Sequence, residues 1–208
     1  MLFRSVELIH NPDKPPVTVG QGTIPGALEL LHNTTRFNWH NNRAHATPKT
    51  GFLYEGWGKI NYEVMHPFPA ENMAMHFCPH EMQAEILNSG RFKVSEGDID
   101  PKDVDADYVF DARGCMSHDY IKLTSPVNSV ILGKPKWNTL ENLWTEGVAT
   151  PNGWTFVIPM HSTSPSHKES VGYIYNNQIT KTEDAEKNFQ EFFDVEVTRH
   201  LTDRKSVV

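Results

Sequence analysis

Apolar and polar residues alternate over several short stretches of this chain, which is the pattern of half-buried β-strands. Clear examples are Phe3–Ile9 and Phe52–Tyr54, and Gly56-Trp57-Gly58 follows the second as a turn. We expect further strands where turn-forming residues enclose short apolar runs: Arg91–Glu96, Tyr108–Phe110, Val127–Leu132, Trp154–Ile158 and Val171–Tyr175. The pattern therefore predicts many short strands rather than a helical bundle.

Helical periodicity appears in three places. Ala27–Leu31 is a short apolar signal, and Pro79–Asn88 begins with a proline, which suits the first turn of a helix. Near the end of the chain we expect an amphipathic helix, with Thr180 and Glu183 as a capping box at its start. Its apolar face consists of four residues at helical spacing: Ala185, Phe189, Phe192 and Phe193. The last segment, Asp194–Val208, has no apolar anchor of its own, so we expect a tail.

Composition narrows the class of protein. The 208 residues carry a formal charge of −7 and include no Lys/Arg-rich patch, which argues against binding to a nucleic-acid backbone. No apolar run approaches the roughly 18 residues of a membrane span. Cys78 and Cys115 stand without a paired motif, as reduced thiols do in a cytoplasmic protein. We expect a cytoplasmic protein without nucleic-acid or membrane partners.

The first candidate for chemistry is Lys49, which leads into the predicted strand Phe52–Tyr54. A lysine beside a buried strand is partly desolvated, which lowers its pKa and makes the amine usable as a nucleophile. Aromatic residues nearby, Trp57 and Phe68, could wall a site for a flat substrate. The alternative is an ordinary surface lysine that precedes a core strand.

Three other features carry weaker signals. Gly20-Gln21-Gly22-Thr23 lies before a predicted helix and could receive an anion, although such turns are common punctuation. Gly114 follows a short predicted strand, where open α/β sheets bring ligands close to the backbone. The run His76–His80 has two histidines and one cysteine, and Pro79 interrupts any helix across them, so we expect a helix start rather than a metal site.

The order of several motifs resembles that of the flavin-dependent tryptophan halogenases. Val19–Pro25 is similar to the family's flavin turn, V-G-E-[AG]-T-x-P. Lys49 lies eight residues before Trp57, as in the frame around the family's catalytic lysine. His66-Pro67-Phe68 looks like the H-x-F segment that frames the aromatic substrate.

The resemblance continues through almost the whole chain. His76-Phe77 and Ala106–Gly114 are similar to the family's H-F-D-A-x helix and A-D-x-x-x-D-x-x-G strand. Gly153–Pro159 is close to G-W-x-W-x-I-P, with Phe156 in place of the second tryptophan. Gly172–Tyr175, and then Thr180 and Ala185, follow the pattern into the family's next helix.

What the resemblance implies is oxidative halogenation of an electron-rich arene. Reduced FAD, oxygen and chloride or bromide would supply hypohalous acid, and Lys49 would receive it and present it to the arene. The implied substrate residues are Trp57, His66, Phe68, Trp154 and Phe156. The implied flavin residues are Gly20, Gln21, Gly22, Thr23 and Gly114.

Four features of the family are absent or altered. The first glycine is Gly20, so the G-x-G-x-x-G turn that holds the FAD pyrophosphate is missing. His10 stands where the family has an acid for the adenosine ribose, and Gln21 replaces a glutamate of the flavin turn. The L-E-P-L-E-S-T segment, with the catalytic glutamate and the halide site, would lie beyond Val208. We therefore expect FAD to bind this chain weakly or not at all.

The resemblance implies a mixed α/β fold, in which a partial FAD-binding nucleotide fold is interleaved with an antiparallel substrate-binding sheet. Residues 1–47 and 75–123 would form the first part, and residues 48–74 and 124–193 the second, in one incomplete domain with residues 194–208 as a tail. Two functions stay open: a halogenase segment that needs a completing chain, a flavin reductase or free reduced flavin, or an inactive relic that serves as a binding or structural module.

Overall fold

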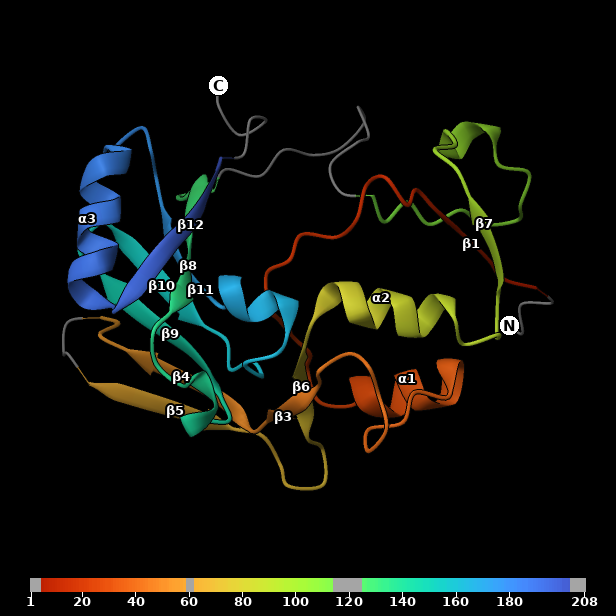
Figure 1. Ribbon diagram of the computed structural model, residues 1–208, viewed down its shortest axis with the longest axis horizontal. Coiled ribbons are helices and arrows are strands. Elements are labelled where there is room, and N and C mark those ends of the chain that lie inside the picture. Colours follow the sequence, from red (N-terminus) through yellow and green to blue (C-terminus); the bar gives the residue numbers. More distant parts are fainter. Residues whose placement is uncertain (1–4, 59–61, 114–124, 203–208) are drawn as a thin grey trace.

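The largest unit is a mixed sheet of seven strands, seen on the left of Figure 1. The computed structural model describes residues 5–58, 62–113 and 125–202. The strands of this sheet, in spatial order, are β12 (Val195–Thr202), β8 (Ser129–Pro135), β11 (Val171–Tyr175), β10 (Gly153–Val157), β9 (Thr145–Thr150), β4 (Gly51–Glu55) and β5 (Glu63–Pro67). All neighbours are antiparallel except β4 and β9, which are parallel.

A second, three-stranded sheet adjoins the first and is antiparallel throughout. It has the order β2 (Gln21–Gly22), β6 (Ala74–Phe77) and β3 (Thr47–Lys49). Two helices, α1 (Ala27–Thr35) and α2 (Pro79–Leu87), lie on the side away from the seven-stranded sheet (Figure 1). Their apolar side chains enclose a small core of four buried residues: Phe37, Ala44, Met75 and Met82.

The remaining sheet is a parallel pair, β1 (Glu7–His10) and β7 (Lys93–Glu96). Three short 3₁₀ helices complete the described elements: Pro101–Asp103, Thr139–Glu141 and Pro165–Glu169. The last of these contains the buried Glu169, which accepts hydrogen bonds from Arg199 on β12 and from Thr18. These hydrogen bonds connect the segment before β2 to the seven-stranded sheet.

The seven-stranded and three-stranded sheets are joined by a crossing of one residue, Thr50, between β3 and β4. Its backbone N–H donates to Leu143 O (2.7 Å), and its own carbonyl accepts from Phe68 N–H (2.8 Å). The next residue, Gly51, needs to be glycine because a Cβ there would lie 2.4 Å from His66 O. The crossing fixes how the small sheet stands against the large one.

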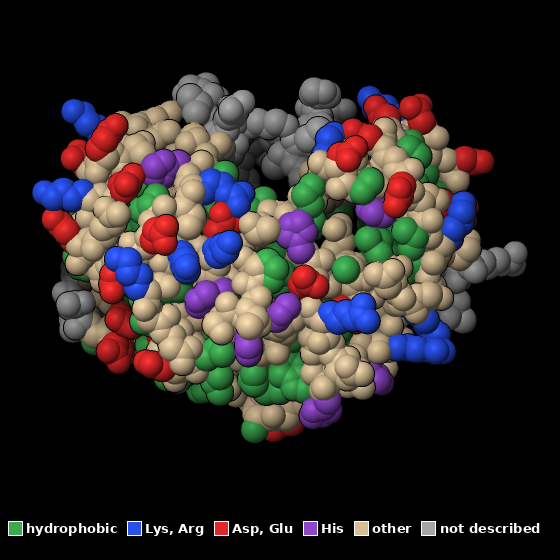
Figure 2. Space-filling view, in the orientation of Figure 1, with side chains coloured by type: hydrophobic (Ala, Val, Ile, Leu, Met, Phe, Trp, Pro, Cys, Tyr) green, Lys and Arg blue, Asp and Glu red, His purple; other side chains and the backbone are tan. Residues whose placement is uncertain are grey.

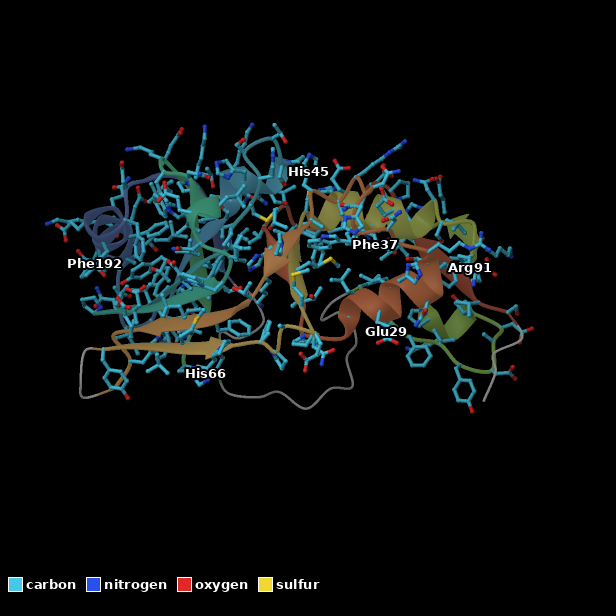
Figure 3. The ribbon with its side chains drawn as sticks, turned by 90° about the horizontal axis from the view of Figure 1, so that it is seen from below. Glu29, Phe37, His45, His66, Arg91 and Phe192 are labelled. Atoms are coloured by element: carbon cyan, nitrogen blue, oxygen red, sulfur yellow. The ribbon has the colours of Figure 1, made fainter. Side chains whose placement is uncertain are left out.

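The main core lies on one face of the seven-stranded sheet, under α3 (Thr182–Phe192). Ala185 and Phe189 of this helix are fully buried against Tyr173 and Ile131. Side chains alternate along each strand, so Tyr54, Trp154 and Phe156 point to the opposite face, which we call the second face. Figure 3 shows His66 of β5 and Phe192 of α3 on opposite sides of β4 and β5. In Figure 2 hydrophobic side chains gather at the lower edge, where Figure 1 has β4, β5 and the connection to β6.

The expected mixed α/β class is confirmed, but the sheet expected to be antiparallel is mixed, because β4 and β9 pair in parallel. Phe52, Trp154 and Tyr173 lie in one sheet, as expected. The expected strands Phe3–Ile9 and Arg91–Glu96 correspond to β1 and β7, which form a parallel pair. The helix expected from Pro79 is confirmed as α2, and Ala27–Leu31 extends to Thr35.

Several expectations are wrong. Tyr108–Phe110 forms no strand, and Phe110 is 83% exposed, because no neighbouring strand pairs with this short run within the described residues. The expected tail contains β12, whose partner β8 lies more than 50 residues earlier and supplies the pairing that the segment cannot provide alone. The predicted capping box does not form, since α3 starts after Lys181 and Thr180 N–H is already bonded to Asn176 O in the preceding turn.

No helix in residues 5–58, 62–113 and 125–202 is long and apolar enough to cross a membrane.

Two phenylalanines of α3 give a matched test of where the core lies. We expect Phe189→Ala to lower the free energy of unfolding by about 3–5 kcal/mol, because it leaves a cavity between α3 and Tyr173. Phe192→Ala removes a ring that is 55% exposed and should cost less than about 1 kcal/mol. Urea unfolding of the two variants measures the difference, and equal losses would contradict the packing described here.

Candidate functional site

Lys49 is the last residue of β3, and its side chain is enclosed where the seven-stranded and three-stranded sheets meet. The residue is 2% exposed. Its Nζ donates a hydrogen bond to Thr23 O (3.2 Å) and lies 3.7 Å from the centroid of the Phe52 ring and 5.7 Å from that of Phe68. Among the described residues no carboxylate lies within 4 Å of this amine. Among the described residues, the amine thus has one carbonyl as its hydrogen-bond partner and two ring faces as cation–π partners.

Burial lowers the pKa of Lys49 to about 8. The cause is desolvation, since water that would solvate the ammonium is excluded and no counter-charge replaces it. Ring faces attract a cation, but less strongly than water does. Near pH 7 roughly one tenth of Lys49 is therefore the free amine, which is the nucleophilic form, and this share rises to about half near pH 8.

His76 of β6 is fully buried beside Lys49. Its Nε2 lies 2.9 Å from Thr145 Oγ1, at the start of β9, so this contact joins the small sheet to the large one. Burial lowers the pKa of His76 to about 3; the positive charge of Lys49 adds to this, and the backbone carbonyl of Pro48 partly offsets it. The imidazole is therefore neutral near physiological pH, and it offers Lys49 no negative charge.

Gly22 of β2 lies against both groups. A Cβ at this position would be 3.0 Å from Lys49 Nζ and 3.3 Å from His76 Cδ2. Glycine allows β2 to close over the lysine, so the turn Gly20–Thr23 forms one wall of the site. The amine is the point where this turn, the small sheet and the aromatic residues of β4 meet.

From Lys49 a row of aromatic rings extends over the second face of the large sheet. Phe52 stacks with Tyr54 at 6.1 Å and meets Phe68 edge-on at 5.7 Å. Tyr54 in turn meets His66 at 5.6 Å and Trp57 at 6.4 Å, both nearly perpendicular. The row then continues through Trp57, Trp154 and Phe156 at spacings of 6.1 and 6.4 Å.

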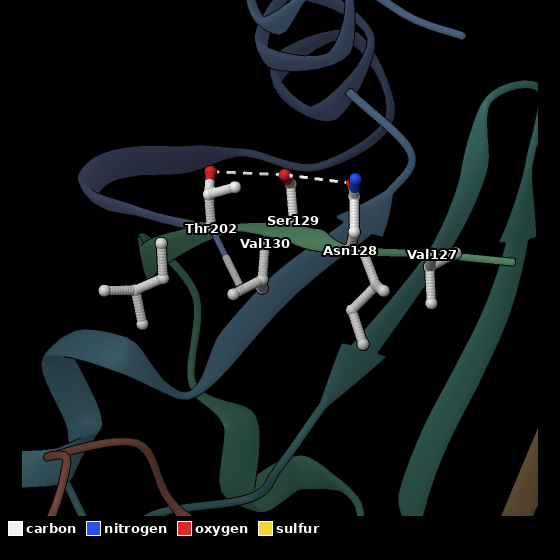
Figure 4. A pocket seen from close by; sticks show the side chains of 7 residues that line it. Val127, Asn128, Ser129, Val130 and Thr202 are labelled. Carbon is white, nitrogen blue, oxygen red and sulfur yellow. Dashed lines mark hydrogen bonds between the residues drawn. The ribbon is translucent and has the colours of Figure 1, made fainter. Parts of the chain in front are cut away.

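Two open cavities lie at this face. One, of about 340 Å³, is lined by Tyr54, Trp57, Tyr62, Val64 and His66. The other, of about 440 Å³, lies at the start of β8 (Figure 4), where a short chain of hydrogen bonds joins Thr202, Ser129 and Asn128. The first cavity continues the aromatic row that starts at Lys49, so it is the one with a connection to the amine.

The residues expected to contact the substrate thus gather on one face. Trp57 is held by a hydrogen bond from Nε1 to Gly147 O (2.7 Å), and His66 is exposed on β5. Phe68 reaches the amine, whereas Trp154 lies further along the row, beyond Trp57. Phe156 leans over Gly172, where a Cβ would lie 2.3 Å from its ring. Lys49 and the aromatic residues therefore form one connected surface.

The residues expected to hold flavin are placed less completely. Gly20 packs on Met160, and Gln21 and Gly22 are exposed in β2. Thr23 is used structurally, because its Oγ1 accepts from Met75 N–H and its carbonyl accepts from Lys49. Gly114 lies outside the described residues. The loop after β1 contains no glycine before Gly20, so it offers no glycine-rich turn for the phosphates of a flavin.

Sequence reasoning missed three members of the site. Phe52 was expected only as a strand residue, yet its ring is the one nearest the amine. Tyr62 lines the cavity. His76 was expected in a motif before a helix and not beside Lys49, where Gly22 and both side chains meet. Within the described part of the chain no group of three metal-ligating side chains is close enough to hold a metal ion. The alternation of Phe52 and Tyr54 was a signal for the first of these residues; the sequence held none for the other two.

Comparison with known proteins identifies the fold. No family model and no curated protein sequence matches the chain. Among solved structures it is similar to MibH, a tryptophan 5-halogenase, with a TM-score of 0.72 and 14% identity over 96% of this chain and 53% of that one. It is also similar to a flavin-dependent halogenase from Xanthomonas campestris (TM-score 0.67, 14% identity, 96% and 56% covered). A tryptophan 6-halogenase from Streptomyces toxytricini gives a TM-score of 0.67 at 16% identity, with 95% and 58% covered.

These likenesses confirm the resemblance inferred from the motifs, as a likeness of fold. The chain has a halogenase-like fold and spans a little over half the length of the structures that it matches.

The pKa of Lys49 can be tested through stability. Because the folded-state pKa is below that of the unfolded chain, the cost of burying the ammonium is complete below pH 8 and is relieved as the pH rises toward 10.5. We expect Lys49→Met to be more stable than the parent by about 1–3 kcal/mol at pH 7, with the advantage shrinking above pH 8. Urea unfolding at several pH values measures this.

The matched control is Lys187→Met, because Lys187 is an exposed lysine of α3 paired with Glu191. Its effect should stay within about 0.5 kcal/mol and change little with pH up to 9. An advantage of Lys49→Met that does not vary between pH 7 and 10 would contradict the lowered pKa.

Proposed function

We propose that this chain is the halogen-transferring part of a flavin-dependent halogenase that acts on an electron-rich aromatic substrate. The observation that carries the proposal is the buried amine of Lys49, which has no carboxylate within 4 Å among the described residues and lies against Phe52 at the start of an aromatic row. The halogenase-like fold supports it.

The chemistry rests on the free amine of Lys49. Hypohalous acid is the co-reactant, and reduced flavin with oxygen and halide would supply it. The nitrogen lone pair attacks the halogen, the oxygen–halogen bond breaks, and the amine proton leaves with hydroxide as water. The arene then attacks the halogen, the nitrogen–halogen bond breaks, and the ring proton returns the lysine to its amine form. A guanidinium could not do this because it stays charged.

The surroundings of Lys49 serve this transfer. The ring faces of Phe52 and Phe68 exclude water from the amine and offer a flat surface on which an arene can stack. The hydrogen bond to Thr23 O fixes the position of Nζ. His76 packs beside the amine without supplying a negative charge, so desolvation alone keeps the pKa of Lys49 low.

The division of the chain follows the same proposal. Residues 1–47 and 75–123 correspond to the FAD-binding part, in which Gly20–Thr23 face the ring of the cofactor, and residues 48–74 and 124–193 form the substrate part. We propose that a completing polypeptide, or free reduced flavin delivered by a reductase, supplies the oxidant. The single domain is thus proposed to act together with a second component.

A second candidate is an inactive relic that keeps only the binding surface. It is favoured by one observation: the loop after β1 has no phosphate-binding glycines. In this case the aromatic row would bind a ligand without chemistry at Lys49.

Hypobromous acid supplied directly separates the two candidates. We expect the parent chain, given one equivalent of the acid at pH 8 and then indole, to produce bromoindole with one regioisomer in excess. Lys49→Met should give the product mixture of the acid alone, because the haloamine cannot form. Chromatography of the bromoindoles measures the ratio, and peptide mass spectrometry locates the halogen.

The matched control is Lys93→Met, which removes an exposed lysine of β7. It should keep the parent's regioisomer ratio. If the parent and Lys49→Met give the same mixture, transfer through Lys49 is excluded and the relic remains.

FAD binding is a separate expectation. The helix-terminus and backbone contacts that hold a pyrophosphate are typically worth about 0.3–1 kcal/mol each or more, and their loss leaves only contacts to the ring. Titrating the purified chain with FAD should therefore produce no saturable change in flavin fluorescence, and the protein should be colourless. A yellow preparation with stoichiometric flavin after gel filtration would show that other residues hold the phosphates.

A further inference from the structure

The cavity beside the aromatic row has the composition of an aromatic cage. Of its five lining residues, three are Tyr54, Trp57 and Tyr62 and a fourth is His66, with Val64 as the only aliphatic member. The three large rings are 37%, 44% and 53% exposed, so their surfaces are available to a ligand. At about 340 Å³ the cavity falls in the range of ligand sites, roughly 300–1,000 Å³.

The rings stand as walls rather than as a stack. Tyr54 is nearly perpendicular to Trp57 (86°) and to His66 (79°), with centroids 6.4 and 5.6 Å away. Trp57 is held in this position because its Nε1 donates to Gly147 O. A cation within about 6 Å of several ring centroids gains from each ring quadrupole, and quaternary ammonium groups are bound in this way.

Charges around the cavity favour the same kind of ligand. Among the described residues that line it there is no lysine or arginine. The next residues along the two strands, Glu55 and Glu63, lie opposite each other in register. The pKa of Glu55 is raised, by burial first and then by the negative charges of Glu146 and Glu63. Glu55 and Glu63 lie on the two strands that carry the cage, and Glu146 lies on the neighbouring strand β9. Their side chains alternate to the face opposite Tyr54 and His66, so they add negative potential from across the sheet and make no contact with the cavity.

We propose that the cage of Tyr54, Trp57, Tyr62 and His66 binds an organic ammonium group, such as a quaternary or alkylated amine. An anionic or neutral ligand of the same shape would lack the attraction to the ring faces and to the carboxylates behind them.

The position of the cage gives this site a role as a substrate subsite, a role that rests on the proposed function. Phe52 lies 3.7 Å from the amine of Lys49 and 6.1 Å from the ring of Tyr54, which together place Tyr54 within about 10 Å of the amine. An aromatic amine could lie with its ammonium group in the cage and its ring over Phe52. The substrate class is then an arylalkylamine rather than an aryl acid.

Two probes that differ in charge but hardly in shape test the cage: choline and 3,3-dimethylbutan-1-ol. The signal is the indole N–H resonance of Trp57 in ¹H–¹⁵N NMR, identified by its loss in Trp57→Phe. We expect choline to shift this resonance saturably and to bind at least about three-fold more tightly than the alcohol, since exposed cation–π contacts give about 0.5–1 kcal/mol each. Tyr62→Leu should weaken choline by a similar factor, whereas Tyr62→Phe, which keeps the ring, should not.

Phe192→Leu, on the other face of the sheet, is the control for loss of an exposed aromatic ring and should leave choline binding unchanged. Equal or tighter binding of the alcohol, or unchanged choline binding in Tyr62→Leu, would overturn the proposal. Tryptamine and indole-3-propionate then test the substrate role, with tryptamine expected to bind more tightly. If choline binds but no halogen is transferred from Lys49 to indole, the cage stands and the proposed halogenase activity fails.

Discussion

The crossing at Thr50 is the constraint on which the rest of the structure depends. One residue separates β3 of the small sheet from β4 of the large one, and its backbone is bonded to Leu143 and Phe68. The last side chain before the crossing, Lys49, must therefore point into the seam between the sheets. The first after it, Gly51, can carry no Cβ because the carbonyl of His66 lies in that place.

The seam also explains why a charged side chain is tolerated there at a cost. His76 and Gly22 close around Lys49 from the other two strands of the small sheet, and Phe52 covers it from β4. Tight packing of this kind excludes water, and the absence of a carboxylate from the described surroundings leaves the ammonium with a carbonyl and ring faces. The fold thus keeps an amine partly neutral near physiological pH. Burying this amine lowers the stability of the folded chain, whereas a lysine at the surface would not.

Local patterns sufficed where an element is stabilised by its own residues. Pro79 and the apolar spacing of Met82 and Ile86 indicated α2, and the apolar runs at β10 and β11 indicated adjacent strands. The same reasoning failed where stability comes from distant partners. Val195–Thr202 is polar enough to pass for a tail and becomes a strand only through its pairing with β8, whereas the apolar Tyr108–Phe110 has no strand beside it among the described residues.

For the site, the sequence by itself determined the chemical groups: a lysine ahead of an alternating aromatic strand, a glycine-rich turn, and aromatic residues in the order typical of halogenases. Tertiary structure alone decided which of these groups meet. The contact of Gly22 and His76 with Lys49, and the corner formed by Tyr54, Trp57 and His66, join positions up to 54 residues apart by cross-strand pairing. Strand register and the one-residue crossing set those contacts, and neither leaves a local pattern in the chain, because both depend on which strands lie side by side.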